Sequence, residues 1–395
     1  MGLPLDGVRV LDLSQYLAGP FGSMILGDLG AEVIKIERPG KGDIVRDMPP
    51  HYVGPVSVYF QSFNRNKKGM TLDLQTDEGH ELFYQMVAKA DIVWDNFRPG
   101  VLERLRCDFE SLAQINPRII CCSVSGYGQT GPYRDRPAVD LVIQARGGIM
   151  SYTGEPGRMP VRMGAPIGDM AGGMFGVKGV LAALYQREKT GRGQRVDVAL
   201  LDCQVALMAY RAAYYLVAGE IAEPVGSGHA SGHPIRAFRT KTFPIVLDAI
   251  VDRQFAELCR LVGHPELSED PRFTTKTARY DNQKDLYQVL DQIFLQRPGE
   301  EWLALLEAQV PVAPINTVDM TLSDPQVLHR GMVIEMEHPT YGKVRGVGNP
   351  IKSSEIEEER FTPAPTLGEH TEEVLRTWLG LGPAEIAGLR EKGVI

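Results

Sequence analysis

The sequence has few cysteines, and their arrangement does not suggest a covalent or metal-bound framework. Its 395 residues include five cysteines, an odd number, and no two of them have the CxxC spacing. They are Cys107, Cys121, Cys122, Cys203 and Cys259. Disulfide scaffolds and structural zinc sites need paired, regularly spaced cysteines. We therefore expect reduced thiols and no metal site.

An excess of positive charge and long hydrophobic runs are also missing. The chain has 42 basic and 50 acidic residues, a net charge of −8, whereas nucleic-acid-binding domains usually carry a basic excess. The sequence has no run of about 18 apolar residues, so it predicts no transmembrane helix. The start, MGLPLDGVRVLDL, does not match a signal peptide, and Asp6 replaces the Ser or Thr of a myristoylation motif. We expect a cytoplasmic protein with neither a nucleic-acid nor a membrane partner.

Several common catalytic signatures are absent. The turn after the first predicted strand reads SQYLAGPFG instead of GxGxxG, and the sequence has no Walker loop, GxSxG elbow or HExxH motif. These absences argue against a nicotinamide or flavin enzyme, a P-loop enzyme, a serine hydrolase and a zinc protease. His229 and His233 flank glycines in a polar segment. For this segment a solvated loop is a simpler interpretation than a metal site.

The sequence does contain a regular alternation of strand and helix signals. Short β-rich or apolar runs occur at residues 8–13, 31–37, 90–97 and 118–126, and Thr76 is placed to cap a helix. Nearly continuous apolar runs are typical of strands that are buried on both faces of a parallel sheet. The pattern predicts an α/β protein with an open parallel sheet of Rossmann type.

Composition changes between residues 220 and 240, where GSGHASGHPIRAFRTKT is polar, basic and without period. Three amphipathic helices follow this loop. We predict a large Rossmann-like domain beginning at 1–200, a linker helix and loop at 201–235, a small α/β domain at 236–318, and a return linker with the rest of the large domain at 319–395. A long helix is expected to start near Leu201.

Three arginines follow the ends of predicted strands. Arg38 comes directly after the run at 31–37, Arg98 lies in NFRPG, and Arg104 follows one helical turn later. Ligands of open α/β sheets bind at the carboxyl ends of the strands, and guanidinium groups donate forked hydrogen bonds to phosphate. These arginines either converge on an anionic ligand or are surface cations, and the sequence leaves both interpretations open.

Asp169 lies in PIGDMAGG, within a glycine-rich stretch between residues 145 and 180. The glycines indicate either close helix packing or a backbone that approaches a ligand. A carboxylate at the start of an apolar helix is commonly an N-cap, but carboxylates also serve as covalent nucleophiles. Spacing alone does not decide between these two roles.

Motifs along the whole chain resemble the class III CoA-transferases, a family that includes formyl-CoA transferases, carnitine CoA-transferases and α-methylacyl-CoA racemases. These motifs are LDGVRVLDLS, AGPFGSMILGDLGAEVIKIERPGKGD, YFQSFNRNKKGMTLDL, DNFRPG, SGYGQTGPY, QARGGIMSYTGEP, GAPIGDMAGG, REKTGRGQRVDVAL, DPQVLHRGMV and LGEHTEEVL. The resemblance implies a CoA-binding Rossmann-like large domain built from both chain ends, a small α/β domain and an interlocked homodimer. It also implies an enzyme that uses acyl-CoA and a small carboxylic acid as substrates and has no permanently bound cofactor.

The resemblance implies that Asp169 attacks the acyl-CoA thioester, giving first an anhydride and then an aspartyl-CoA thioester. It also implies a set of CoA contacts. These are Arg38, Thr71, Leu72, Asp73, Asn96, Phe97, Arg98 and Arg104. Backbone N–H groups of the glycine-rich stretch are candidates for stabilising the oxyanions.

Two departures from the family pattern narrow the implied activity. Val139 stands where racemases of the family carry an acid–base histidine, which disfavours racemisation. Leu17 replaces a glutamine of the formyl-CoA transferases, and their GGGGQ lid has no counterpart, which disfavours formate and oxalate.

A basic loop is either solvated surface or a dicarboxylate site; it contains His233, Arg236, Arg239 and Lys241. We expect a CoA-transferase that uses a small dicarboxylate such as succinate. An acyl-CoA racemase or epimerase and a non-catalytic CoA-binding protein remain the alternatives.

Overall fold

The computed structural model describes residues 2–356 and 359–395, and it divides into two compact units. The large unit comprises Met1–Ile149, Arg162–Glu220 and Gln326–Ile395, and the small unit comprises Met150–Val161 and Ile221–Pro325. The small unit therefore includes a segment, 150–161, that we had assigned to the large domain. In this segment the carbonyl oxygen of Gly154 accepts a 2.9 Å hydrogen bond from the backbone N–H of Gly226.

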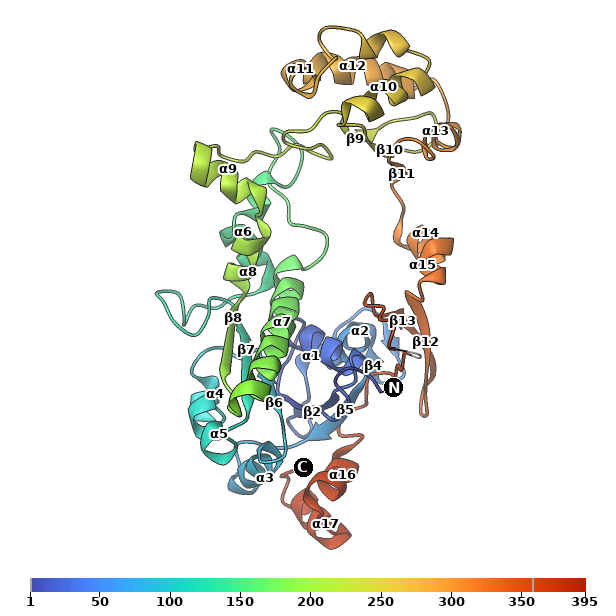
Figure 1. Cartoon of the computed structure of the whole chain (residues 1–395). Helices are drawn as coiled ribbons and strands as arrows, with labels where there is room; N and C mark the ends of the chain where they lie inside the picture. The colour runs from blue at the N-terminus through green and yellow to red at the C-terminus, as the bar shows by residue number, and fades with distance from the viewer. Residues whose placement is uncertain (1, 357–358) are drawn as a thin grey trace. The chain divides into compact units, whose positions relative to one another are not determined.

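The large unit is built on a six-stranded parallel sheet (Figure 1). In spatial order its strands are β5 (Lys67–Thr71), β2 (Glu32–Glu37), β1 (Arg9–Asp12), β6 (Ile92–Asp95), β7 (Ile120–Ser125) and β8 (Arg195–Ala199). This order corresponds to 3-2-1-4-5-6, with a topological switch point between β1 and β6. The predicted α/β fold with a parallel sheet is confirmed.

Helices cover both faces of this sheet, and neighbouring strand residues point to opposite faces. Val10 packs into a core with Trp94 and Val177 of α7, whereas Leu11 packs into a core with Phe83 of α3 and with C-terminal residues. The helices are α1 (Ala18–Asp28), η1 (Ile44–Asp47), α2 (Val58–Asn64), α3 (Asp77–Val87), α4 (Val101–Arg104), α5 (Phe109–Ile115), α6 (Asp140–Arg146), α7 (Ile167–Thr190), α8 (Leu200–Leu207), α9 (Tyr210–Ala218), α16 (Thr371–Val374), η4 (Leu375–Leu379) and α17 (Pro383–Glu391). Because buried strands alternate their side chains, the nearly continuous apolar runs follow directly from this two-sided covering.

Both ends of the chain contribute to the large unit. Trp378 and Val394 belong to the core on the α3 face of the sheet. The Asp73 N–H donates to the Val394 carbonyl at 2.8 Å, and the His370 N–H donates to the Gly69 carbonyl at 2.8 Å. Two hairpins complete the unit: β3 (Tyr52–Val53) with β4 (Val56–Ser57), and β12 (Val333–His338) with β13 (Gly342–Val347).

The helix expected from about Leu201 is not continuous. It is broken into α8 and α9 at Ala209, which has a φ of 48°. A positive φ in a residue with a Cβ atom is incompatible with a continuing right-handed helix. The helix after Thr76 is confirmed, since the Thr76 hydroxyl accepts from the Gly79 N–H at 3.0 Å.

The small unit combines an antiparallel sheet with helices around its own core. The strands, in order β11-β10-β9, are β9 (Ile235–Phe238), β10 (Ile245–Asp248) and β11 (Val312–Pro314). The helices are α10 (Asp252–Leu261), η3 (Pro265–Ser268), α11 (Lys276–Asp281), α12 (Gln283–Phe294), α13 (Gly299–Leu306) and α14 (Val318–Ser323). The short helices η2 (Ile149–Tyr152) and α15 (Pro325–His329) each contain a boundary between the units along the chain.

Helix α7 is long and apolar enough to cross a membrane by length and composition alone. In the structure it packs along α1 and against β7 and β8. Ala171 and Val180 are fully buried in this packing. These contacts are those of a helix that packs into the core of the large unit.

Candidate active site

Asp169 is the third residue of α7 and not its cap. The N-cap position is Pro166, and no side chain caps the helix from that position. Instead, Oδ1 of Asp140, at the start of α6, accepts the N–H groups of Gly168 at 2.8 Å and Asp169 at 3.3 Å. The N-cap interpretation of Asp169 is therefore wrong, because the Asp140 carboxylate accepts the N–H groups at the start of the helix. Within the described residues, the Asp169 carboxylate accepts no hydrogen bond.

The surroundings of Asp169 favour its protonated form. Burial, and then the negative charge of Asp140, raise the pKa of Asp169 to about 7. Asp140 is itself held in place, since Gln144 donates from Nε2 to its Oδ2 at 2.7 Å while Gln144 Oε1 accepts from the Met163 N–H at 2.9 Å. Asp169 is thus a carboxylate whose pKa lies near neutral pH and which has no hydrogen-bond partner in the part of the chain that the structure describes, a combination typical of a functional group.

The amides of Gly168 and Asp169 are already used by Asp140. They are therefore not free to stabilise an oxyanion. We had expected the glycine-rich stretch to supply N–H groups for that role. Part of that stretch serves helix packing instead. A Cβ atom on Gly173 would lie 2.7 Å from the backbone oxygen of Ala18, and one on Gly176 would lie 2.6 Å from the Trp94 ring. By contrast, Gly157 and Gly164 have open space around them.

Tyr59 of α2 is a member of the site that sequence reasoning missed. It is half-buried, and burial followed by the charges of Asp169, Asp140 and Asp43 raises the pKa of its phenol. The phenol therefore lies within electrostatic reach of Asp169. In the sequence Tyr59 is one aromatic residue of an apolar run, YFQSF, with nothing to set it apart.

The residues expected to contact CoA follow the carboxyl ends of adjacent strands. Arg38 follows β2, residues 71–73 end and follow β5, and residues 96–98 follow β6. Because β5, β2, β1 and β6 are parallel neighbours, these ends meet at one edge of the sheet. Arg38 is half exposed and lies 3.8 Å from Asp73 in an ion pair.

These residues differ in how free their side chains are. Leu72 is buried in the core, so only its backbone can meet a ligand. Asn96 uses both ends of its amide on the backbone of Gln15, at 2.7 and 2.8 Å. Arg104 lines a surface hollow of about 330 Å³, together with Leu74, Gln75, Val101, Leu105 and Arg106. Arg98 lines a separate, smaller hollow with Phe97.

The basic loop of the small unit is not simply solvated. His233 is buried, and its Nδ1 lies 2.8 Å from the Tyr287 hydroxyl. Arg236 forms an ion pair with Asp291, and its guanidinium lies 4.1 Å from the centre of the Tyr287 ring. Two of the four residues proposed for a dicarboxylate are therefore already committed to contacts within the small unit.

A family model described as CoA-transferase family III matches residues 5–371. The chain belongs to this family. The class III resemblance is thereby confirmed, and the protein is a CoA-transferase.

Similar proteins span nearly the whole length of this CoA-transferase. The human succinyl-CoA:glutarate CoA-transferase is 40% identical over 393 residues, which is 99% of this chain and 90% of the relative. An acetyl-CoA:oxalate CoA-transferase of Acetobacter aceti is 40% identical and covers 93% of both chains. The crystal structure of a CaiB/BaiF family protein from Brucella suis is 38% identical, with a TM-score of 0.86 over 96% of this chain and 100% of that chain.

Proposed function

We propose that this CoA-transferase moves CoA between small dicarboxylic acids, with Asp169 as the covalent nucleophile. The observation that carries the proposal is the position of Asp169: partly buried, without a hydrogen-bond partner for its carboxylate among the described residues, and in the first turn of α7. With a pKa of about 7, the carboxylate is still partly ionised near neutral pH, and its position in the first turn of a helix favours this charged form. The similarity to succinyl-CoA:glutarate enzymes supports dicarboxylate substrates.

The reaction divides one transfer between acids into exchanges at Asp169. Its carboxylate adds to the donor thioester carbonyl and expels CoA thiolate, which gives a mixed anhydride. The thiolate then adds to the Asp169 carbonyl, which releases the donor acid and leaves an aspartyl-CoA thioester. The acceptor carboxylate repeats these steps in reverse order, so it leaves as acyl-CoA and Asp169 is regenerated. Excluding water protects the anhydride from hydrolysis.

We propose that CoA lies along the carboxyl edge of the sheet. Arg38 and Arg104 would bind phosphate oxygens, with residues 71–73 and 96–98 alongside. The half-exposed Arg38 and the hollow beside Arg104 support this placement. To bind a phosphate, Arg38 has to exchange its loose contact with Asp73 for the ligand.

We propose that the enzyme works as an interlocked homodimer. On α9, Tyr215, Leu216 and Val217 are 59%, 79% and 88% exposed. Clustered exposed apolar side chains of this kind are typical of protein interfaces. A second subunit would bury them.

The racemase alternative receives no support from the position of Val139. Its side chain is 62% exposed and has no group that could exchange a proton. Carbon acid chemistry needs an acid–base pair across the α-carbon, and Val139 cannot supply one member of that pair.

A panel of CoA esters and free acids tests the proposed function. Succinyl-, glutaryl- and acetyl-CoA are each incubated with succinate, glutarate, oxalate or formate, and new thioesters are measured by mass spectrometry. We expect transfer between the C4 and C5 dicarboxylates, no transfer by Asp169→Ala, and retained CoA binding by that variant. Asp202→Ala removes an exposed carboxylate of α8 and serves as the matched control. Transfer by Asp169→Ala at the wild-type rate would refute the nucleophile.

A further inference from the structure

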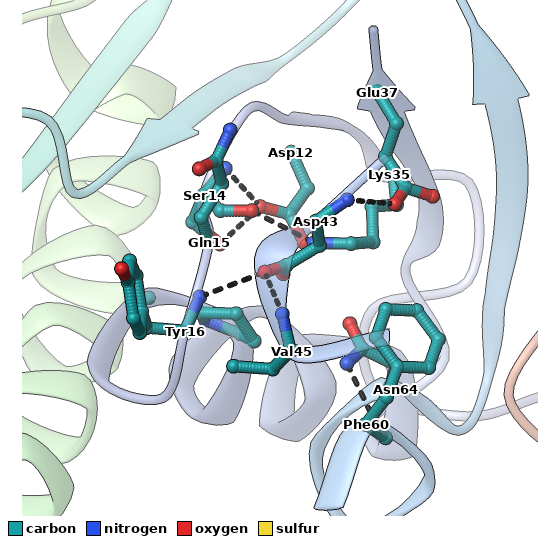
Figure 2. A network of polar contacts seen from close by, with 12 residues as sticks. Asp12, Ser14, Gln15, Tyr16, Lys35, Glu37, Asp43, Val45, Phe60 and Asn64 are labelled. Carbon is teal, nitrogen blue, oxygen red and sulfur yellow. Dashed lines mark hydrogen bonds and ion pairs between the residues drawn. The ribbon is translucent and has the colours of Figure 1, made fainter. Parts of the chain in front are cut away.

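The loop between β1 and α1 is held by a pair of opposite charges that has no contact with solvent (Figure 2). The side chains of Lys35 and Asp43 are both fully buried, 3.0 Å apart. Lys35 Nζ also donates to the Ser14 carbonyl at 2.7 Å. Asp43 Oδ1 accepts from the Tyr16 N–H at 3.2 Å. One buried pair therefore holds the loop backbone at two points, the Ser14 carbonyl and the Tyr16 N–H.

Two further side chains hold the same loop from other strands. Asp12 Oδ1 accepts from the Ser14 N–H at 2.9 Å. Across the switch point, Asn96 accepts from the Gln15 N–H and donates to the Gln15 carbonyl. The backbone of residues 14–16 is thus bound by side chains from three parts of the sheet.

The loop is strained at Tyr16, and such strain calls for this degree of support. Tyr16 has a φ of 65°, a conformation that is unfavourable for a non-glycine residue and persists only where several surrounding contacts hold it. A buried ion pair is also a poor source of stability, because apolar residues of similar volume serve as well or better. Lys35 and Asp43 therefore point to a role in fixing the loop, beyond stabilising the fold.

The held loop lies beside the Asp169 turn. It runs directly into Ala18, whose carbonyl oxygen approaches Gly173, and Gly173 is one turn after Asp169 on the same face of α7. Tyr59 gives a second link, since the charges of both Asp169 and Asp43 act on its phenol. Gln15 of the same loop also lines a groove of about 670 Å³, together with Gly40, Lys41, Gly42, Ile44, Asp47, Met48 and Pro49.

We propose that the Lys35–Asp43 pair positions the loop at residues 14–17 so that acyl-CoA bound beside this loop meets Asp169 in a reactive geometry. Lys35 and Asp43 are positioning residues, and they act through the loop backbone. The inference rests on the proposed role of Asp169. It adds that a buried ion pair fixes the position of the loop backbone.

The test compares Asp43→Asn with Asp28→Asn in the full-length protein. Asp28 is also a buried acid in an ion pair, with Arg65, but it lies at the far end of α1. We expect Asp43→Asn to lower kcat about 100-fold, because a displacement near 1 Å costs that much. The KM for acyl-CoA should stay within a few-fold of wild type. Asp28→Asn should keep the wild-type kcat at a similar loss of unfolding midpoint.

A double variant covers the case in which Asp43→Asn does not fold. Lys35→Met with Asp43→Leu replaces the pair by apolar groups of similar size and leaves neither charge of the pair behind, so we expect a higher unfolding midpoint than that of Asp43→Asn, with kcat still reduced. Hydrogen exchange at residues 14–17 should be faster in Asp43→Asn and in the double variant. Wild-type kcat in a folded form of either variant with faster exchange would overturn the positioning role and leave Asp169 as nucleophile intact. Loss of kcat with unchanged exchange would overturn it as well.

Discussion

Replacing Asp140 by Asn isolates the electrostatic control of Asp169. Asp140 faces the first turn of α7, and Asn retains an oxygen that can accept from the Gly168 N–H, so the helix start is preserved while the charge is removed. The nucleophile must be ionised to attack. Because its pKa is raised, activity towards acyl-CoA should rise with pH through about 7 in the wild-type enzyme.

The size of the effect follows from the two causes of the raised pKa. It increases from 3.8 to about 7, and burial contributes more than the charge of Asp140. Removing the charge should therefore recover less than half of the increase, or about one pH unit, which corresponds to about 1.4 kcal/mol. The sign is fixed: without the like charge Asp169 ionises more easily, so the acidic limb moves to lower pH.

The assay is kcat/KM for acyl-CoA between pH 5 and 9 at constant ionic strength, since this ratio reports the free enzyme. Asp202→Asn makes the same change in net charge on the exposed surface of α8 and should leave the limb in place. The plateau of Asp140→Asn is expected to fall if Gln144 loses its acceptor, but the limb position is the readout. An unmoved limb, or one displaced to higher pH, would refute this account of the raised pKa.

Two other variants test packing and CoA binding. Gly173→Ala places a methyl group 2.7 Å from the Ala18 backbone oxygen, so we expect urea denaturation to show a free energy of unfolding lower by about 1–3 kcal/mol. The control, Gly388→Ala, has open space in α17 and should be neutral or slightly stabilising. Equal effects of the two substitutions would contradict the close α1–α7 contact. Arg38→Gln should raise the KM for acyl-CoA at least tenfold with little change in kcat, as measured by initial rates. The control, Arg118→Gln, lies before the amino end of β7 and should leave the KM unchanged. An unchanged KM in Arg38→Gln would remove Arg38 from the proposed CoA site.

The apolar strands were predictable from sequence, but β5 was not. The runs that became β1, β2, β6 and β7 are nearly continuous in apolar residues, because both faces of the sheet are covered. β5 reads KKGMT, and its first residue, Lys67, is buried. The ammonium group of Lys67 lies 3.0 Å from Asp12 and also donates to the Pro20 carbonyl and to Asn64. With only Met70 as a strongly apolar residue, β5 shows no apolar run, and its place in the sheet depends on contacts with Asp12 and Pro20, which are distant in sequence.

The candidate site was likewise only partly predictable from the sequence. Asp169 stood out through its motif, but its N-cap role could be excluded only by seeing that Asp140, 29 residues earlier in the chain, accepts the Asp169 N–H. Tyr59 and Lys35 carry no local signal, because their significance comes from charges on other elements. Sequence spacing reports neighbours along one element, whereas electrostatic and hydrogen-bond partners are set by how the elements pack.

Trapping the covalent intermediate tests the central claim most directly. The enzyme is incubated with an acyl-CoA donor and no acceptor, treated with hydroxylamine or borohydride, digested, and analysed by mass spectrometry. We predict modification of Asp169 in the wild-type enzyme and none in Asp169→Ala. An unmodified Asp169 in an enzyme that is turning over, or a modification at another carboxylate, would contradict Asp169 as the nucleophile.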